Sequence, residues 1–237
     1  MNMSGTTKTN TSLILSVIIM ALSPQMVSAQ DDDLSVDFDL NATSDYIYRG
    51  ISRTGGDPAI QGSVEVSNDS GFYGRVFASS LDNGLGQDAE TEFALGYFGS
   101  ATNFDYELSV AYDKFWGGPN DKGYAEIRSS ISRDMGFLYA RTGLNYAPDN
   151  REFGGGSSLY GYGEIEVPFP INIGIPLSMN VRTGYEAFES IDNKWDWSVN
   201  LIAGINDFVI SAGYHDVKGN TFFRGKSRFN LSVRYYF

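Results

Sequence analysis

Alternation of apolar and polar residues with a period of two is the feature that most constrains the fold of this chain. At residues 228–237 one face carries Phe229, Leu231, Val233, Tyr235 and Phe237, and the other carries Asn230, Ser232, Arg234 and Tyr236. Successive side chains of a β-strand point to opposite faces, so this stretch is predicted to be an amphipathic strand. The same pattern recurs along the chain. We therefore expect a sheet that this last strand closes.

Twelve stretches show the pattern, some of them weakly, and most have at least ten residues, enough for a tilted strand to cross a bilayer. They are residues 34–48, 59–68, 71–81, 90–101, 103–114, 122–133, 136–147, 158–168, 176–187, 195–206, 207–216 and 226–237. Short turns rich in Asn, Asp and Gly alternate with longer loops between them. This rhythm is typical of an outer-membrane barrel. The predicted fold class is all-β: a twelve-stranded antiparallel up-and-down transmembrane β-barrel. The long turn at 168–176 departs from the rhythm, and the sequence predicts no role for it.

Composition excludes several classes of protein. The chain has no Cys, so it is not a disulfide scaffold. Its formal charge of −12 disfavours nucleic acid, which requires a basic footprint. After residue 29 no segment approaches the ~18 uncharged apolar residues of a membrane-spanning helix.

Residues 1–29 are predicted to be a secretory signal peptide, and residues 30–237 the barrel. Lys8 provides a basic start, residues 13–22 form an apolar stretch and Pro24 interrupts it. The segment ends on Val27-Ser28-Ala29, small residues of the kind found before a cleavage site.

The two faces of each strand give opposite expectations. No strand requires a charge on its apolar face, and a Lys or Arg facing lipid at mid-depth would cost about 2–4 kcal/mol. Aromatic residues are expected in two girdles near the strand ends. One would hold Phe72, Phe104, Phe137 and Phe208, and the other Tyr46, Tyr112, Tyr146, Tyr185, Tyr214, Trp116 and Trp195. The alternative is a soluble β-sandwich or barrel, whose apolar residues would pack inside.

The polar face is the expected site of function. The pore-lining candidates are Arg75, Glu92, Glu107, Arg128, Arg141, Glu164, Arg182 and Arg234. One interpretation is a water-filled lumen whose excess of acids weakly favours cations. The other is a lumen filled by Arg–carboxylate pairs, since twelve strands lie between the filled eight-stranded and the open sixteen-stranded barrels. We expect a narrow pore, because the loops are too short for one to fold deep inside. No metal, cofactor or catalytic residue is predicted.

Lipid hydrolysis is the main alternative activity. It requires a Ser beside a His base, and His215 is the single His in the sequence. No G-x-S-x-G element is present, so transport is favoured over catalysis. A structural or adhesive barrel without transport is the third alternative.

The segment Ser44-Asp45-Tyr46-Ile47-Tyr48-Arg49-Gly50-Ile51-Ser52, followed by Pro58-Ala59-Ile60-Gln61-Gly62, resembles the TorF-type porin family. The resemblance implies a Gram-negative outer-membrane barrel with passive transport, and it implies no catalytic or ligand-binding residues. From the residues themselves, Gly50 permits a tight bend at a strand end. Arg49 is expected to reach headgroup phosphates or a neighbouring acid.

These observations together predict a porin-like channel in the bacterial outer membrane for small hydrophilic solutes or ions. The expected partners are outer-membrane lipid, lipopolysaccharide and the barrel-assembly machinery. The terminal strand ending at Phe237 is the part that this machinery would recognise.

Overall fold

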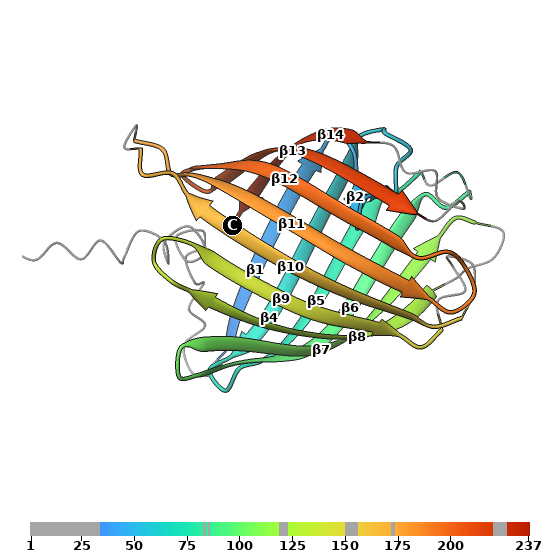
Figure 1. The fold of residues 1–237 in the computed structure, drawn as a ribbon, viewed down its shortest axis with the longest axis horizontal. Helices are drawn as coiled ribbons and strands as arrows, with labels where there is room; N and C mark the ends of the chain where they lie inside the picture. Colours follow the sequence, from blue (N-terminus) through green and yellow to red (C-terminus); the bar gives the residue numbers. More distant parts are fainter. Residues whose placement is uncertain are drawn as a thin grey trace, which may run out of the picture.

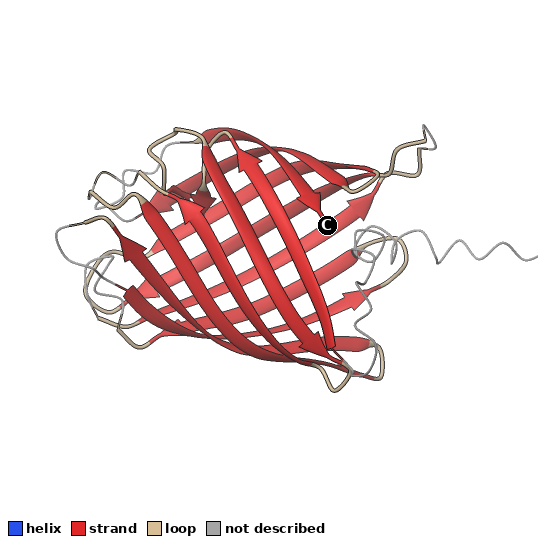
Figure 2. Ribbon diagram, turned by 180° about the vertical axis from the view of Figure 1, so that it is seen from behind, coloured by secondary structure: helices blue, strands red, loops and turns tan. Residues whose placement is uncertain are grey.

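The chain forms a closed antiparallel barrel of twelve strands, with a two-stranded hairpin in addition (Figures 1 and 2). The structure is a computed structural model that describes residues 34–82, 84, 86–118, 123–149, 156–171, 174–219 and 227–237. The predicted fold class is confirmed. The predicted signal peptide at residues 1–29 lies outside the described residues.

The barrel strands follow one another in chain order around the wall. They are β1 (Leu34–Thr43), β4 (Ala59–Asn68), β5 (Phe72–Ser80), β6 (Ala89–Ala101), β7 (Phe104–Trp116), β8 (Gly123–Asp134), β9 (Tyr139–Ala147), β10 (Ser158–Pro168), β11 (Leu177–Phe188), β12 (Lys194–Ile205), β13 (Phe208–Gly219) and β14 (Arg228–Tyr236). The additional hairpin consists of β2 (Ile47–Tyr48) and β3 (Ile51–Ser52), which pair with each other alone. Among the described residues, no helix is long and apolar enough to cross a membrane.

The barrel closes where the first strand meets the last. β1 pairs with β4 over ten positions and with β14 over five, from Asp39↔Tyr236 to Thr43↔Ser232. The backbone N–H of Phe237 also donates to the carbonyl oxygen of Phe38 at 3.2 Å. The chain therefore forms a continuous cylinder, in which strand pairing satisfies the backbone polar groups of the wall.

The two ends of the barrel differ. The terminal end holds the C-terminus, the tight turns and the long turn at 168–176, and the loop end holds the other long connections (Figure 1). Thr102, Asn206, Gly71 and Gly136 have positive φ angles in four of the tight turns, as the turn residues predicted. The turn at 168–176 carries a backbone hydrogen bond from Phe169 N to Leu177 O at 2.9 Å, so it prolongs the β10–β11 pairing beyond Pro168.

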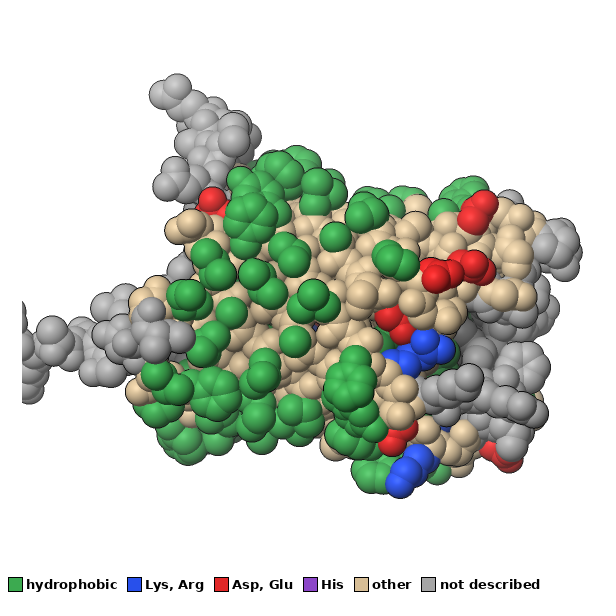
Figure 3. Space-filling model, turned by 90° about the horizontal axis from the view of Figure 1, so that it is seen from above, with side chains coloured by type: hydrophobic (Ala, Val, Ile, Leu, Met, Phe, Trp, Pro, Cys, Tyr) green, Lys and Arg blue, Asp and Glu red, His purple; other side chains and the backbone are tan. Residues whose placement is uncertain are grey.

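Apolar side chains point outward, as the alternation predicted. Leu95 is 73 % exposed and Phe229 is 80 % exposed, whereas polar residues on the opposite face, such as Asn41 and Glu126, are buried. On the face shown in Figure 3, the apolar side chains cover the outer surface from the terminal end past the middle, and charges gather toward the loop end. This is the reverse of a soluble β-sandwich, so that alternative is wrong.

The expectation of an outer face without charges is wrong near the ends of several strands, where Lys114, Arg133, Asp216 and Lys218 lie on that face. Two of these cations pack against aromatic rings. Lys114 Nζ lies 5.3 Å from the centre of the Trp116 ring at the loop end. Arg133 Cζ lies 5.2 Å from the centre of the Phe104 ring at the terminal end. Both cations lie near a rim, where a long side chain can reach the aqueous boundary.

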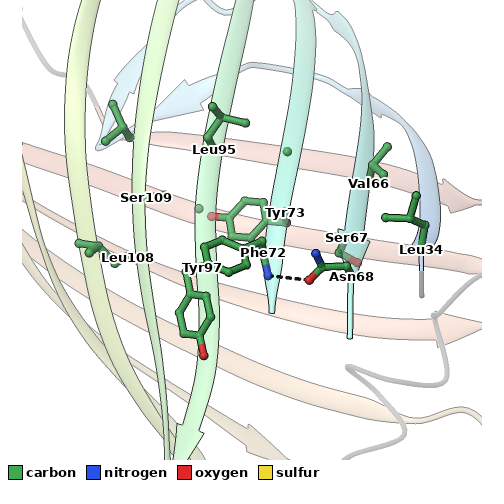
Figure 4. A pocket seen from close by; sticks show the side chains of 13 residues that line it. Leu34, Val66, Ser67, Asn68, Phe72, Tyr73, Leu95, Tyr97, Leu108 and Ser109 are labelled. Carbon is green, nitrogen blue, oxygen red and sulfur yellow. Dashed lines mark hydrogen bonds between the residues drawn. The ribbon is translucent and has the colours of Figure 1, made fainter. Parts of the chain in front are cut away.

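Aromatic side chains mark both rims, with one correction. Phe72, Phe104, Phe137 and Phe208 are exposed at the terminal end, and Tyr112, Tyr146, Tyr185, Trp116 and Trp195 at the loop end. Figure 4 shows the terminal rim of β1 and β4–β7, where Phe72 and Tyr97 form an edge-to-face pair with ring centres 5.0 Å apart. Tyr46 does not belong to a girdle. It packs inside the barrel against the cluster of Leu81, Phe115, Tyr124 and Ala147.

Candidate functional site in the barrel lumen

A polar cavity of about 830 Å³ occupies part of the lumen. Six of the eight pore-lining candidates line it: Arg75, Glu92, Glu107, Arg128, Arg141 and Arg182. The other two lie on the same inner face but do not line this cavity. Glu164 pairs with Arg182 at 3.6 Å, and Arg234 pairs with Asp39 at 3.5 Å. The alternation of side chains along the strands thus brings six of the eight predicted residues to the wall of one cavity.

Arg128, on β8, is the most heavily paired cation of the cavity. Its guanidinium lies 2.8 Å from Glu92, 2.7 Å from Glu126 and 3.5 Å from Asp113. Glu126 is also paired with Arg49, so two guanidiniums are placed among these three carboxylates. Arg128 therefore fixes the positions of these carboxylates and offers little free positive charge to a solute.

Arg141, on β9, belongs to a second group of polar contacts nearer the terminal end. Its Nη2 donates to Glu107 at 2.5 Å and to Ser130 at 2.9 Å, and the Tyr73 hydroxyl donates to the other oxygen of Glu107 at 2.5 Å. Arg182, on β11, lies with its Cζ 4.2 Å from the centre of the Tyr162 ring. Donors and acceptors are thus held in place around the cavity wall.

Arg75, on β5, differs from the other three arginines of the cavity. Among the described residues no carboxylate lies within 4.0 Å of its guanidinium, although Glu65 is its cross-strand partner. Its charge is therefore the least neutralised of the four at short range.

The inner hairpin, defined here as residues 44–58 with β2 and β3, enters the loop end of the lumen. Arg49, at its tip, has a side chain that is 5 % exposed. Its Nη2 contacts both oxygens of Glu126 on β8 at 2.7 and 2.9 Å, and its Nη1 contacts Glu186 on β11 at 3.0 Å. Lys194 Nζ, on β12, donates to the Arg49 carbonyl oxygen at 2.9 Å. The tip is thereby attached to three strands.

Gly50 allows the tip to approach the wall. Its φ of +78° is the left-handed region that favours glycine. A β-carbon added there would lie 2.8 Å from the β-carbons of Asp196 and Val217. Both the backbone conformation and the space therefore require glycine at this position.

Arg53 attaches the second arm of the inner hairpin. Its guanidinium forms an ion pair with the buried Glu90 on β6 and lies 3.9 Å from the centre of the Tyr48 ring. Burial raises the pKa of Tyr48 to about 12, so its phenol is neutral at physiological pH. Asp45, at the base, accepts hydrogen bonds from Thr54 and Arg228, both at 3.0 Å. The inner hairpin is thus a fixed part of the lumen.

Two expectations about this segment are corrected. The first strand was predicted to run to residue 48, but β1 ends at Thr43 and the chain turns inward. The loops were expected to be too short to fold deep inside, yet the loop after β1 fills part of the bore. The expectation that Arg49 reaches a neighbouring acid is confirmed. A signal was present in the sequence, because Tyr46-Ile47-Tyr48 is unusually apolar for a surface loop.

His215 does not form a catalytic pair among the described residues. It lies on the inner face of β13, where its Nε2 is 3.1 Å from Asn230 Oδ1. No hydrogen bond joins it to a serine hydroxyl within this part of the chain. In the same described residues, no cluster of three or more His, Asp and Glu side chains could hold a metal ion.

Several solved structures with a similar fold are porins. The KdgM porin aligns with a TM-score of 0.55 and 12 % identity, over 85 % of this chain and 98 % of that one. The KdgM porin in complex with disordered oligogalacturonate aligns with a TM-score of 0.51. The NanC porin aligns with a TM-score of 0.52 and 8 % identity, over 83 % of this chain and 97 % of that one. At identities this low, the structural alignments show a shared barrel fold alone.

The sequence comparisons give the family. No curated protein matches the chain. A family model described as "Bacterial protein of unknown function (Gcw_chp)" matches residues 29–235, nearly the whole barrel. The chain therefore belongs to the bacterial Gcw_chp family and has the twelve-stranded barrel fold of porins.

Proposed function

We propose that the chain is an outer-membrane channel through which small hydrophilic solutes or ions pass passively, and that the inner hairpin limits its conductance. The observation that carries the proposal is the charged cavity of about 830 Å³ inside a barrel whose outer face is apolar. Such an outer face is stable in hydrocarbon, and a charged lumen admits hydrated solutes. The porin fold of the KdgM and NanC structures supports this proposal.

Orientation and assembly follow from the same proposal. The terminal end faces the periplasm, because short turns are typical of that side of outer-membrane barrels. The loop end then meets lipopolysaccharide, and β14, which Phe237 follows, is the strand offered to the assembly machinery. Residues 1–29 serve as the export signal. The segment at Ser44–Ser52 supports a relationship to TorF-type porins.

The selectivity proposed is a weak preference for cations. Acids outnumber bases on the inner face, but the cavity itself is lined by four arginines and by Glu65, Glu92 and Glu107. Mixed charges of this kind produce a small net field at the narrow part of the path. Oligogalacturonate is bound by the KdgM porin, and a strongly anionic solute of that kind fits this lumen less well than a neutral or cationic one.

The inner hairpin favours a second candidate, a structural barrel without transport. Its ion pairs with Glu90, Glu126 and Glu186 hold it across the loop end of the bore. Planar-bilayer recording of the refolded protein distinguishes the two. We expect small conductance steps in the unmodified protein and larger steps when the inner hairpin is loosened. If neither protein conducts, the channel proposal fails and the structural barrel is favoured.

A further inference from the structure

We propose that a groove on the outer face of β7–β11, at the terminal end, binds one glycerophospholipid, with the phosphate on Arg133 and an acyl chain in the groove. This inference rests on the proposed location in a membrane. It goes beyond the general contact of any barrel with lipid, because it assigns one site with one headgroup ligand.

The groove has a volume of about 640 Å³ and an apolar lining. It forms because small outward residues, Ala140, Thr142 and Gly163, lie beside larger ones, Ile131 and Ile165. A β-carbon on Gly163 would meet no atom within 4 Å, so the floor of the groove at this point is open space. An acyl chain is a flexible apolar ligand suited to such a depression.

The rim of the groove carries a cation without an anion. Phe104, Arg133 and Met135 line this edge, and Arg133 Cζ lies 5.2 Å from the centre of the Phe104 ring. Within the described residues, no ion pair to Arg133 exists, and its Nε is buried without a hydrogen-bond partner. The guanidinium therefore has no anionic partner within this part of the chain, and an anion from outside that contacts its outer nitrogens would stabilise it.

The geometry favours a phosphate as that acceptor. A guanidinium donates two parallel hydrogen bonds to a phosphate, a match of shape as well as of charge. Arg133 is at the end of β8, near the terminal rim, whereas the groove extends from it toward the middle of the wall. A lipid in the leaflet at this end would have its phosphate at the level of Arg133 and its acyl chains directed into the groove.

A second groove on the same barrel provides an internal comparison. It surrounds Gly74 near the terminal rim, has a volume of about 580 Å³, and is lined by Leu34, Val66, Leu95, Leu108 and other apolar residues (Figure 4). No Lys or Arg side chain lines it. This groove offers an acyl chain a similar surface but gives the phosphate no partner, so it should not discriminate between headgroups.

The test is native mass spectrometry of the purified full-length protein in a mild detergent. Two probes are added separately: palmitoyl-oleoyl phosphatidylglycerol, and the diacylglycerol with the same chains and no phosphate. Because hydrogen bonds to a charged group are strong, we expect the phospholipid to be retained about tenfold better or more. Arg133→Gln should remove this preference, and Arg133→Lys should retain part of it.

Three further variants make the test specific. Gly163→Leu fills the groove and should reduce retention of both probes, whereas Gly74→Leu fills the uncharged groove and should leave the headgroup preference unchanged. Arg234→Gln removes an arginine that faces the lumen at the same end and should have no effect. An unchanged preference in Arg133→Gln overturns the proposal, as does equal retention of both probes. A dimer that Arg133→Gln dissociates would assign the groove to a second copy and also overturn it. Conductance by a protein that retains no phospholipid refutes this site while leaving the channel proposal intact.

Discussion

Arg49 donates to both carboxylate oxygens of Glu126, at 2.7 and 2.9 Å, across the loop end of the barrel. The two side chains are 5 % and 1 % exposed, so this pair is shielded from water. It joins a residue on a connecting segment to a wall strand 77 positions away. The position of the inner hairpin therefore depends on a contact within the bore.

Arg49→Ala should loosen the inner hairpin and increase conductance. Removing one partner of a buried pair costs about 3–5 kcal/mol. Arg128 and Lys194 remain beside the two carboxylates, so we expect about 3 kcal/mol here. Planar-bilayer recording should show larger single-channel steps than in the unmodified protein. Arg234→Ala is the control, because its pair with Asp39 is more exposed. Equal conductance in Arg49→Ala and the unmodified protein would contradict the role assigned to the inner hairpin.

Gly50→Ala should destabilise the folded barrel more than the same change at another left-handed glycine. Gly136 has a φ of +82° and no atom within 4 Å of an added β-carbon, so Gly136→Ala measures the backbone effect alone. At Gly50 the same strain is combined with contacts of 2.8 Å to two β-carbons. Overpacking adds about 1–3 kcal/mol. Urea unfolding in detergent should separate the two variants, and equal losses would refute the close approach.

Arg75→Gln should shift the channel toward cations, and Glu65→Gln should shift it toward anions. The two residues are cross-strand partners on β5 and β4, and both side chains line the cavity. Each change removes one charge of opposite sign from the same level of the path, so the shifts in reversal potential should have opposite signs. Measurement in a potassium chloride gradient checks this. Shifts in the same direction would show that the current does not pass this pair.

Ser157→Ala should raise the pKa of Glu189 part of the way to its ordinary value. Hydrogen bonds from the backbone N–H and the hydroxyl of Ser157, at 2.9 and 3.2 Å, hold the pKa of that carboxyl below its usual range. Because the pKa of Glu189 is lowered, the stabilisation from these two hydrogen bonds is fully present above the ordinary pKa of a glutamate. It is lost as the pH falls through the lowered value. Carboxyl carbon shifts recorded by NMR during an acid titration measure it.

A neighbouring serine serves as the control for that titration. Ser190→Ala removes a hydroxyl that makes no hydrogen bond to Glu189 among the described residues, so it should leave the pKa unchanged. If Ser157→Ala also leaves it unchanged, the hydroxyl does not contribute and only the backbone N–H can be responsible.

The wall of the barrel could be predicted from the sequence because one rule governs it. Side chains of each wall strand point alternately to lipid and to the lumen. The outward position of Phe229 and the inward position of Asn230 can therefore be predicted without knowing which strands lie beside β14. The tight turns were equally local, since Asn, Asp and Gly at 68–71 and 206–207 favour positive φ angles. The same alternation predicted most of the charged side chains that line the cavity.

The inner hairpin could not be predicted because its contacts are distant in sequence. Asp45 ends the first strand by accepting hydrogen bonds from Ser52 and Thr54, and from Arg228 on the last strand. Nothing in the segment itself specifies that Glu126 and Glu186 face its tip. The pairing of Arg128 with three carboxylates could not be predicted either, because it depends on how β6, β7 and β8 align with one another.

The seam between β1 and β14 dictates an order of events during biogenesis. Its pairs join residues near 40 to residues near 235, so it cannot form until both of these distant segments are present. Until then the growing sheet has two unpaired margins, which invite association with other chains. The inner hairpin contacts β6, β8, β11, β12 and β14, so its full set of contacts requires strands from the whole circumference of the barrel. The closed seam and the narrowed bore therefore depend on the same long-range assembly, and neither can be complete in a partly formed sheet.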